Sequence, residues 1–258
     1  METVEHDGRT TAFRVANRGT SDRTLLFIHG SGADHRVWKA QDRLARDHRV
    51  VSIDLSGHGD SADIETEIGP PTLDAYVADV AAVADETDAD VLVGNSLGGA
   101  VVQWALLEEA VSVDGAVLVG TGAKLAVLEQ LRTWLAEDFD RAVDFLHEPD
   151  RLFSESVDER LVRASREAMY DCGRAVTERD FLTCHHFDVR EDIDEIEVPI
   201  LVIGGERDGL TPPAYHEFIA ETVNDGSVTI MADAAHLVML ERPEAFNEAV
   251  SSFVQRLD

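Results

Sequence analysis

Five short runs of apolar and β-branched residues limit the fold of this chain more than any other feature. They occupy residues 25–29, 50–54, 90–94, 116–119 and 199–204. Runs of this kind are typical of strands that are buried on both faces of a parallel sheet. Helical patterns at 73–87 and 100–109 lie between them. Because strand and helix alternate, the sequence predicts an α/β fold with a mostly parallel central sheet.

Further elements extend this sheet domain toward both ends of the chain. We expect an additional strand at 10–16, a short strand at 227–231 and a closing helix at 243–256, with Pro243 in its first turn. Between residues 123 and 190 the strand pattern stops, and a helical pattern of mixed polarity replaces it. The sequence therefore predicts one domain, formed by 1–122 and 191–258, that carries a small helical cap at 123–190.

The composition indicates a folded protein that is neither membrane-bound nor a partner of nucleic acid. Of the 258 residues, 44% are hydrophobic, which is enough for a sizeable core. No stretch approaches the roughly 18 apolar residues of a membrane span, and the first residues do not resemble a signal peptide. We therefore expect a cytoplasmic protein. The net charge of −29 makes nucleic acid a poor candidate partner.

The acidic residues are spread along the whole chain and do not form a tail. A surface of this kind repels itself at low ionic strength. Salt screens that repulsion, because the Debye length falls from about 10 Å at 0.1 M to about 3 Å at 1 M. Lysine is scarce, occurring only as Lys39 and Lys124. We interpret this composition as an adaptation to a salt-rich cytoplasm, with a merely acidic mesophilic protein as the alternative.

Ser96 is the candidate nucleophile of the chain. It lies at the centre of the segment GNSLG at 94–98, which follows one expected strand and enters an expected helix. A serine in that position occupies a sharp, strained turn, and small residues on either side let strand and helix approach closely. The start of the helix also directs free N–H groups and its positive dipole end toward the serine.

A serine hydroxyl is a weak nucleophile, so it needs a base, and the base needs a carboxylate to orient it. Of the ten histidines, His236 is the best base, because it lies in a loop of small residues after a short strand. Asp208 ends an expected strand, which places it at the carboxyl edge of the sheet, where open α/β folds hold their sites. Glu206 and Asp54 are weaker competitors for the role of the acid.

Several motifs, in the same order along essentially the whole chain, resemble those of the α/β-hydrolase fold family. They are HGSG at 29–32, DLSGHGDS at 54–61, GNSLG at 94–98, PILVIGGERD at 199–208, and AH at 235–236 with ERP at 241–243. The resemblance implies an α/β-hydrolase fold and the catalytic triad Ser96, Asp208 and His236. It also implies an oxyanion hole formed by the backbone amides of Ser31 and Leu97, and it gives His29 and His58 structural roles.

The resemblance further implies a serine hydrolase that acts on a small carboxylic ester or lactone, similar to carboxylesterases and enol-lactone hydrolases. It implies no cofactor, and a small molecule as the only partner. The same triad also serves C–C bond hydrolases, aminopeptidases, perhydrolases and lyases, and some members of the family sense a ligand without catalysis. These alternatives, the natural substrate and the oligomeric state stay open at this point.

We expect no metal site. His185 and His186 are adjacent, and neighbours on a helix point about 100° apart, so both cannot easily bind one ion. They are assigned to the surface of the cap or the rim of its pocket. Cys172 and Cys184 have no accompanying ligand pattern, and we expect ordinary buried or half-buried thiols.

The dispersed acidity predicts that the fold needs salt. The free energy of unfolding, measured by urea denaturation across a series from low to molar KCl, should rise with salt, because screening reduces the repulsion among surface carboxylates. The same free energy at every KCl concentration would exclude the halophilic interpretation.

Overall fold

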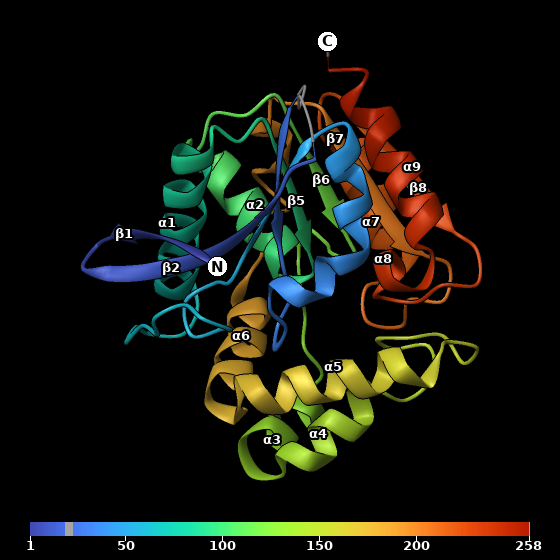
Figure 1. The fold of residues 1–258 in the computed structure, drawn as a ribbon. Coiled ribbons are helices and arrows are strands. Elements are labelled where there is room, and N and C mark those ends of the chain that lie inside the picture. Colours follow the sequence, from blue (N-terminus) through green and yellow to red (C-terminus); the bar gives the residue numbers. More distant parts are fainter. Residues whose placement is uncertain (19–22, 258) are drawn as a thin grey trace.

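A mixed sheet of eight strands forms the centre of the described part of the protein, which comprises residues 1–18 and 23–257 of a computed structural model. The strands follow the order β1-β2-β4-β3-β5-β6-β7-β8 across the sheet (Figure 1). Their bounds are β1 Glu2–His6, β2 Arg9–Ala16, β3 Thr24–Ile28, β4 Arg49–Ile53, β5 Val91–Asn95, β6 Gly115–Val119, β7 Ile200–Gly205 and β8 Gly226–Met231. From β4 to β8 all neighbours are parallel, as the sequence predicts.

Strand β1 is the part of the sheet that the sequence analysis missed, whereas β2 matches the strand expected at 10–16. Strands β1 and β2 pair antiparallel, and β2 pairs antiparallel with β4. Asp7 and Gly8 both have positive φ, at 45° and 74°, which matches the two-residue turn that an Asp-Gly pair favours. A search for runs of apolar residues does not find β1, because its residues are exposed or half-buried.

Helices cover both faces of the sheet, and alternate strand residues supply one apolar core on each side. On one face, Leu26 and Ile28 pack with α1 (Pro70–Thr87), α2 (Leu97–Leu107) and α7 (Pro213–Thr222). On the other, Leu25 and Phe27 pack with η1 (His35–Arg46), α8 (Val238–Glu241) and α9 (Pro243–Val254). The 3-10 helix η1 was not predicted. Its Trp38 is fully buried against Phe27, and Asp34 caps its first turn.

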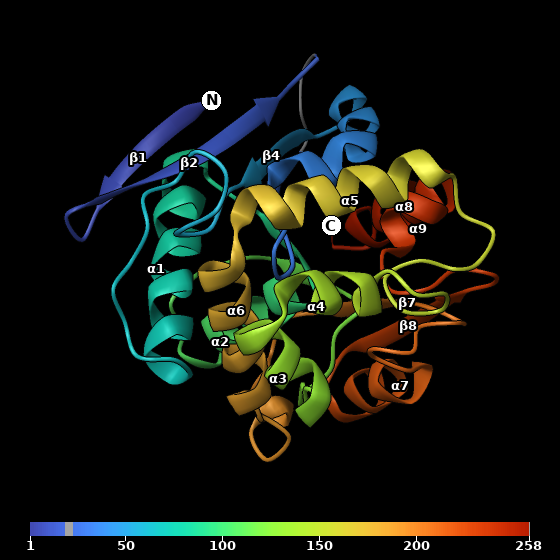
Figure 2. The ribbon, with the colours of Figure 1, turned by 90° about the horizontal axis from the view of Figure 1, so that it is seen from below.

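A helical insert separates β6 from β7 and lies at the end of the sheet where β5 meets α2 (Figures 1 and 2). It contains α3 (Glu129–Glu137), α4 (Phe139–Leu146), α5 (Glu159–Cys172) and α6 (Arg174–His186). A short turn, η2 (Ile193–Glu195), leads back to the sheet. Helix α6 packs against α1 and α2, so one side of the insert is continuous with the core. Within the described residues, no helix has the length and apolar character needed to cross a membrane.

Three histidines, two of them buried and one half-buried, are held in their neutral form. Burial lowers the pKa of His29, His147 and His216 to about 4 in each case. His216 is the extreme case, because it is fully buried and neither ring nitrogen has a hydrogen-bond partner. Each of these rings binds a proton near pH 6.5 once the chain unfolds.

These three rings should therefore lower the free energy of unfolding as the pH drops from 6.5 to about 4. A base whose pKa is depressed in the folded state stabilises the fold above its unfolded pKa, and this contribution is lost as pH falls through the folded value. His216→Leu should give a shallower fall, since one proton fewer is taken up on unfolding. Urea denaturation at pH steps and constant KCl measures both slopes, and equal slopes for the two proteins would contradict this assignment.

Candidate active site

Ser96 lies in the sharp turn between β5 and α2 that its sequence predicts. Its backbone has φ 54° and ψ −114°, a conformation that a residue other than glycine rarely adopts. The first turn of α2 also lies so close to β3 that a Cβ on Gly98 would be 2.4 Å from the Ile28 carbonyl oxygen. Ser96 N–H donates to the Val119 carbonyl (2.9 Å), and the Thr121 hydroxyl donates to the Ser96 carbonyl (2.9 Å). The nucleophile turn is thus fixed by β6 as well as by its own two elements.

The structure brings two of the predicted triad members into direct contact. His236 Nδ1 donates to Asp208 Oδ2 at 2.9 Å, and both side chains are buried. The geometry also shows a residue that the sequence analysis did not single out. Thr211 donates its hydroxyl to the same Asp208 oxygen at 2.7 Å, while the N–H groups of Leu210 and Thr211 donate to Oδ1 at 2.8 Å each. Each carboxylate oxygen therefore receives two hydrogen bonds.

These donors explain the charge state of Asp208. Burial alone would raise the pKa of its carboxyl, but His236 and the Thr211 donors outweigh burial and hold that pKa below its usual value. The two competing acids lie elsewhere. Glu206 is exposed and accepts from the N–H of Asp233, while Asp54 accepts from His35 and from the N–H of Asp60. Asp208 is thus the acid that contacts His236.

Ser96 and His236 face a common cavity of about 850 Å³. Among the described residues, no hydrogen bond joins the Ser96 hydroxyl to the imidazole. Such bonds are often long in an empty site and shorten when substrate binds. Ser96 and His236 therefore share one space, and the bond to Asp208 engages Nδ1 of the His236 ring.

The two predicted oxyanion donors, Ser31 and Leu97, belong to segments that adjoin Ser96. Leu97 is the first residue of α2, and the first N–H groups of a helix have no partner within it. Gly30 and Ser31 line the cavity, and a Cβ on Gly30 would lie 3.1 Å from the Ser96 Cβ. A side chain at residue 30 would crowd Ser96, because the loop passes close to the serine. His29 bonds this loop to its neighbours, through Nδ1 to the Gly30 carbonyl and through Nε2 to the N–H of Leu55.

The interior of the cavity is mostly apolar. Charged residues also line it, but all of them except Asp34 are exposed, and Asp34 is paired with Arg36. Cys184 adds a buried thiol whose pKa burial raises to about 12, and Cys172 is a half-buried free thiol. His185 and His186 are absent from the described lining and lie on the surface of the insert. The main apolar lining residues are Leu131, Phe145, Leu152, Leu161, Met169 and Phe181.

A loop of the insert contacts both loops that carry the acid and the base. The Asp150 carbonyl accepts from the N–H of Gly209 (2.9 Å), next to Asp208. The carbonyls of Arg151 and Leu152 accept from the N–H groups of His236 (3.2 Å) and Leu237 (2.9 Å). No local motif marks these residues, because they act through backbone atoms.

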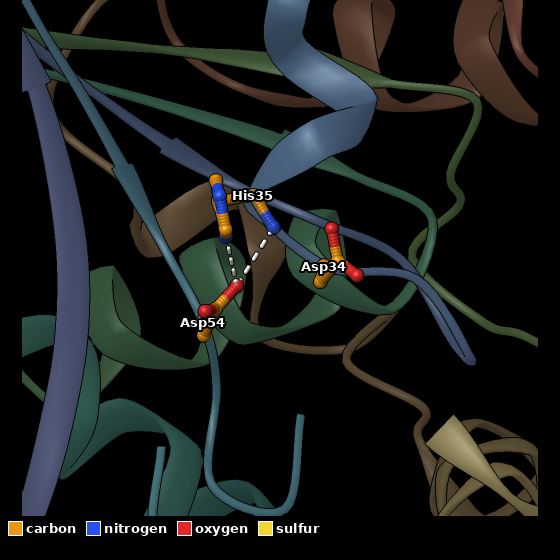
Figure 3. A group of neighbouring side chains, drawn as sticks. All are labelled: Asp34, His35 and Asp54. Carbon is orange, nitrogen blue, oxygen red and sulfur yellow. Dashed lines mark hydrogen bonds and ion pairs between the residues drawn. The ribbon is translucent and has the colours of Figure 1, made fainter. Parts of the chain in front are cut away.

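One group of potential metal ligands occurs in the described residues, formed by Asp34, His35 and Asp54 (Figure 3). Its polar atoms are already engaged. Asp54 Oδ1 accepts from the backbone and ring nitrogens of His35 at 2.8 Å each, and the Asp34 carboxylate is bound by Arg36. The hydrogen bond to Asp54 raises the pKa of His35, which favours the protonated ring that cannot ligate a metal. The group is a structural link between η1 and β4.

Comparisons with known proteins show the family to which the chain belongs. The model of the Alpha/beta hydrolase family matches residues 25–249. A 3-oxoadipate enol-lactonase 2 of Acinetobacter baylyi is 27% identical over 96% of this chain and 94% of its own length. A pimeloyl-[acyl-carrier protein] methyl ester esterase of Neisseria meningitidis is 27% identical over 90% and 94%. The solved structure of a thermophilic esterase superposes with a TM-score of 0.87 at 32% identity, covering 99% of this chain and 97% of that one. The chain therefore belongs to the alpha/beta hydrolase family.

Proposed function

We propose that this protein is a serine hydrolase that cleaves small, uncharged carboxylic esters or lactones. The observation that carries the proposal is the buried hydrogen bond from His236 to Asp208, whose imidazole faces the same cavity as Ser96. This pairing of a base with an orienting acid beside a strained serine is what acyl transfer requires. The esterase and enol-lactonase names of the relatives point to the hydrolysis of carboxylic esters or lactones.

The proposed reaction proceeds in two halves through an acyl-enzyme. His236 takes the proton of Ser96 as its oxygen attacks the carbonyl carbon, and the N–H groups of Ser31 and Leu97 bind the developing oxyanion. The imidazolium then gives its proton to the departing alcohol oxygen as the ester bond breaks. A water, deprotonated by His236, attacks the acyl-enzyme, and the acid leaves as Ser96 regains its proton. Asp208 stays ionised throughout and stabilises the imidazolium.

The cavity favours an uncharged substrate with an apolar group. A charged substrate loses hydration in an apolar cavity, at a cost that only a buried counter-charge would offset. The exposed cations of the lining, Arg36, Lys39 and Arg43, form ion pairs with Asp34, Asp42 and Glu244 respectively. The same reasoning disfavours an aminopeptidase, whose substrate carries an ammonium group. An apolar acyl or alkyl group packed against the lining is the better match.

The wild-type protein should hydrolyse p-nitrophenyl butyrate and hexanoate in molar KCl, and Ser96→Ala should lose at least about 10³-fold in kcat. Ser252→Ala, on the exposed side of α9, is the matched control and should keep full activity. Initial rates follow nitrophenol release. Equal hydrolysis by wild type and Ser96→Ala would refute the proposal.

The same assay tests the charge of the substrate. p-Nitrophenyl hemisuccinate carries a carboxylate, and its kcat/KM should be at least about tenfold lower than that of the butyrate ester. A higher kcat/KM for the hemisuccinate would instead indicate a cation that acts on the acyl group.

Thr211→Val should lower kcat by about tenfold with little change in KM. The hydroxyl donates to the oxygen of Asp208 that also accepts from His236, and a hydrogen bond to a charged group contributes about 1.5–3 kcal/mol. Thr222→Val, at the end of α7, removes a hydroxyl that bonds only to a helix carbonyl and should leave kcat unchanged. Steady-state kinetics with the butyrate ester compare the three proteins, and a Thr211→Val enzyme with wild-type kcat would show that the hydroxyl has no part in orienting the triad.

A further inference from the structure

A buried polar cluster outside the triad joins helix α6 of the insert to the core. Asp180 on α6 is fully buried, and its carboxylate accepts from His58 Nε2 (2.9 Å) and from the Tyr76 hydroxyl (2.7 Å). Arg179 donates to the same hydroxyl (3.2 Å) and to Asp63 (2.8 Å). A buried carboxylate is costly unless it is fully paired, so its presence between two elements calls for a specific reason.

A third donor to Asp180 comes from the loop that holds the proposed oxyanion donor. The N–H of Gly32 donates to Asp180 Oδ2 at 3.1 Å. Gly32 has φ +66°, and a Cβ there would meet Met169 at 3.1 Å and Thr177 at 3.2 Å, so the insert packs directly on this turn. This N–H belongs to the peptide that follows Ser31. Asp180 therefore fixes the loop on the carboxyl side of Ser31.

The hydrogen bonds of His58 show that its ring is an imidazolium. Nε2 contacts the Asp180 carboxylate, and Nδ1 contacts the Ser56 carbonyl at 3.2 Å. Both partners can only accept, so both ring nitrogens must donate. Burial opposes this charge, but Asp180 outweighs burial and raises the pKa of His58 well above its usual value. The sequence analysis expected a structural role for His58. The ion pair with Asp180 means that the ring of His58 fills this role in its charged form.

The charged ring of His58 lies against the neutral ring of His29, with the ring centres 4.6 Å apart. His29 Nε2 accepts from the N–H of Leu55 at 3.1 Å, so the proton of the neutral ring must be on Nδ1, which donates to the Gly30 carbonyl at 2.9 Å. Burial and the neighbouring charge of His58 together lower the pKa of His29 to about 4. The Gly30 carbonyl and the N–H of Ser31 belong to one peptide plane. His29 therefore fixes the loop on the amino side of Ser31.

We propose that Asp180 is a positioning residue for the oxyanion hole. Asp180 holds the amide of Ser31 in place through Gly32 on one side and through His58 and His29 on the other. The inference rests on the proposed function. Asp180 touches no reacting atom, and its effect passes entirely through the loop at 29–32. The insert thereby supplies part of the electrostatic machinery of the active site as well as the wall of the cavity.

An anchor that merely attaches α6 to the core would behave differently. Its loss would reduce stability, or loosen substrate binding, without changing how the enzyme treats the carbonyl oxygen. A thionoester, in which sulfur replaces that oxygen, distinguishes the two roles because sulfur is a poor acceptor for oxyanion-hole N–H groups. The ratio of kcat/KM for an ester to that for its thionoester therefore reports the geometry of the oxyanion hole.

Three variants should be compared with wild type in molar KCl, by this ratio and by kcat and KM for the ester. Asp180→Asn keeps the shape of the side chain but replaces charge-assisted bonds with weaker neutral ones, and should lower the ratio about threefold. The double variant His58→Leu with Asp180→Leu replaces the buried ion pair by apolar contacts, a change that such sites often tolerate. It should lower the ratio and kcat by about tenfold or more, with little change in KM. Tyr76→Phe removes the hydroxyl that donates to Asp180 Oδ1 and accepts from Arg179. It leaves the bonds of Oδ2 to His58 and Gly32 in place and should keep the wild-type ratio.

The outcomes separate this inference from the proposed function. Wild-type hydrolysis with an unchanged ratio in the folded double variant would overturn the role of Asp180 and leave the proposed function intact. If the double variant does not fold, a wild-type ratio in Asp180→Asn would overturn it equally. A fall of the ratio in Tyr76→Phe as large as that in the double variant would show a general loosening of the insert, and would also count against it. A wild-type protein without esterase activity is instead a failure of the proposed function.

Discussion

The close approach of the first turn of α2 to strands β3 and β5 is the constraint on which the rest of the site depends. A Cβ on Gly94 would lie 2.3 Å from the Gly98 carbonyl oxygen, so neither the end of the strand nor the start of the helix has room for a side chain. The turn between them forces Ser96 into a positive φ and exposes the first N–H groups of α2 beside its hydroxyl. The other elements of the site are arranged around this turn.

The helical insert does more than cover the site, because it also holds several of the loops in place. Its loop at 150–152 binds the backbone of the acid and base loops, and Asp180 on α6 binds the loop that passes beside Ser96. The insert thus contacts the loop that passes beside Ser96 and the loops that hold Asp208 and His236. On helix α5, Met169 is the only buried residue among those described, and it packs against the turn at Gly32. The hydrogen bonds from the insert to these loops come instead from the loop at 150–152 and from α6.

The elements that the sequence predicts are those whose signal is local. The apolar runs of the parallel strands, the small residues around Ser96 and the loops that end in Asp208 and His236 can each be recognised within about ten residues, and the structure brings Asp208 and His236 into contact. The contacts that were missed join distant residues. Gly32 and Asp180 are 148 positions apart, and the bonds of the 150–152 loop use backbone carbonyls that any sequence offers. Strand β1 and helix η1 were missed because mostly polar residues form them.

The buried carboxylates of this acidic protein differ from its surface carboxylates in their electrostatic surroundings. Asp54, Asp180 and Asp208 each accept several fixed hydrogen bonds from the surrounding protein, at distances between 2.7 and 3.1 Å. Bulk ions screen exposed charges over the Debye length but do not enter such contacts, so salt leaves these interactions nearly unchanged. The carboxylates that repel one another, and that salt screens, are those on the surface. Loss of activity at low salt would therefore follow unfolding of the whole domain, because the bonds that hold the cavity and its loops do not depend on screening.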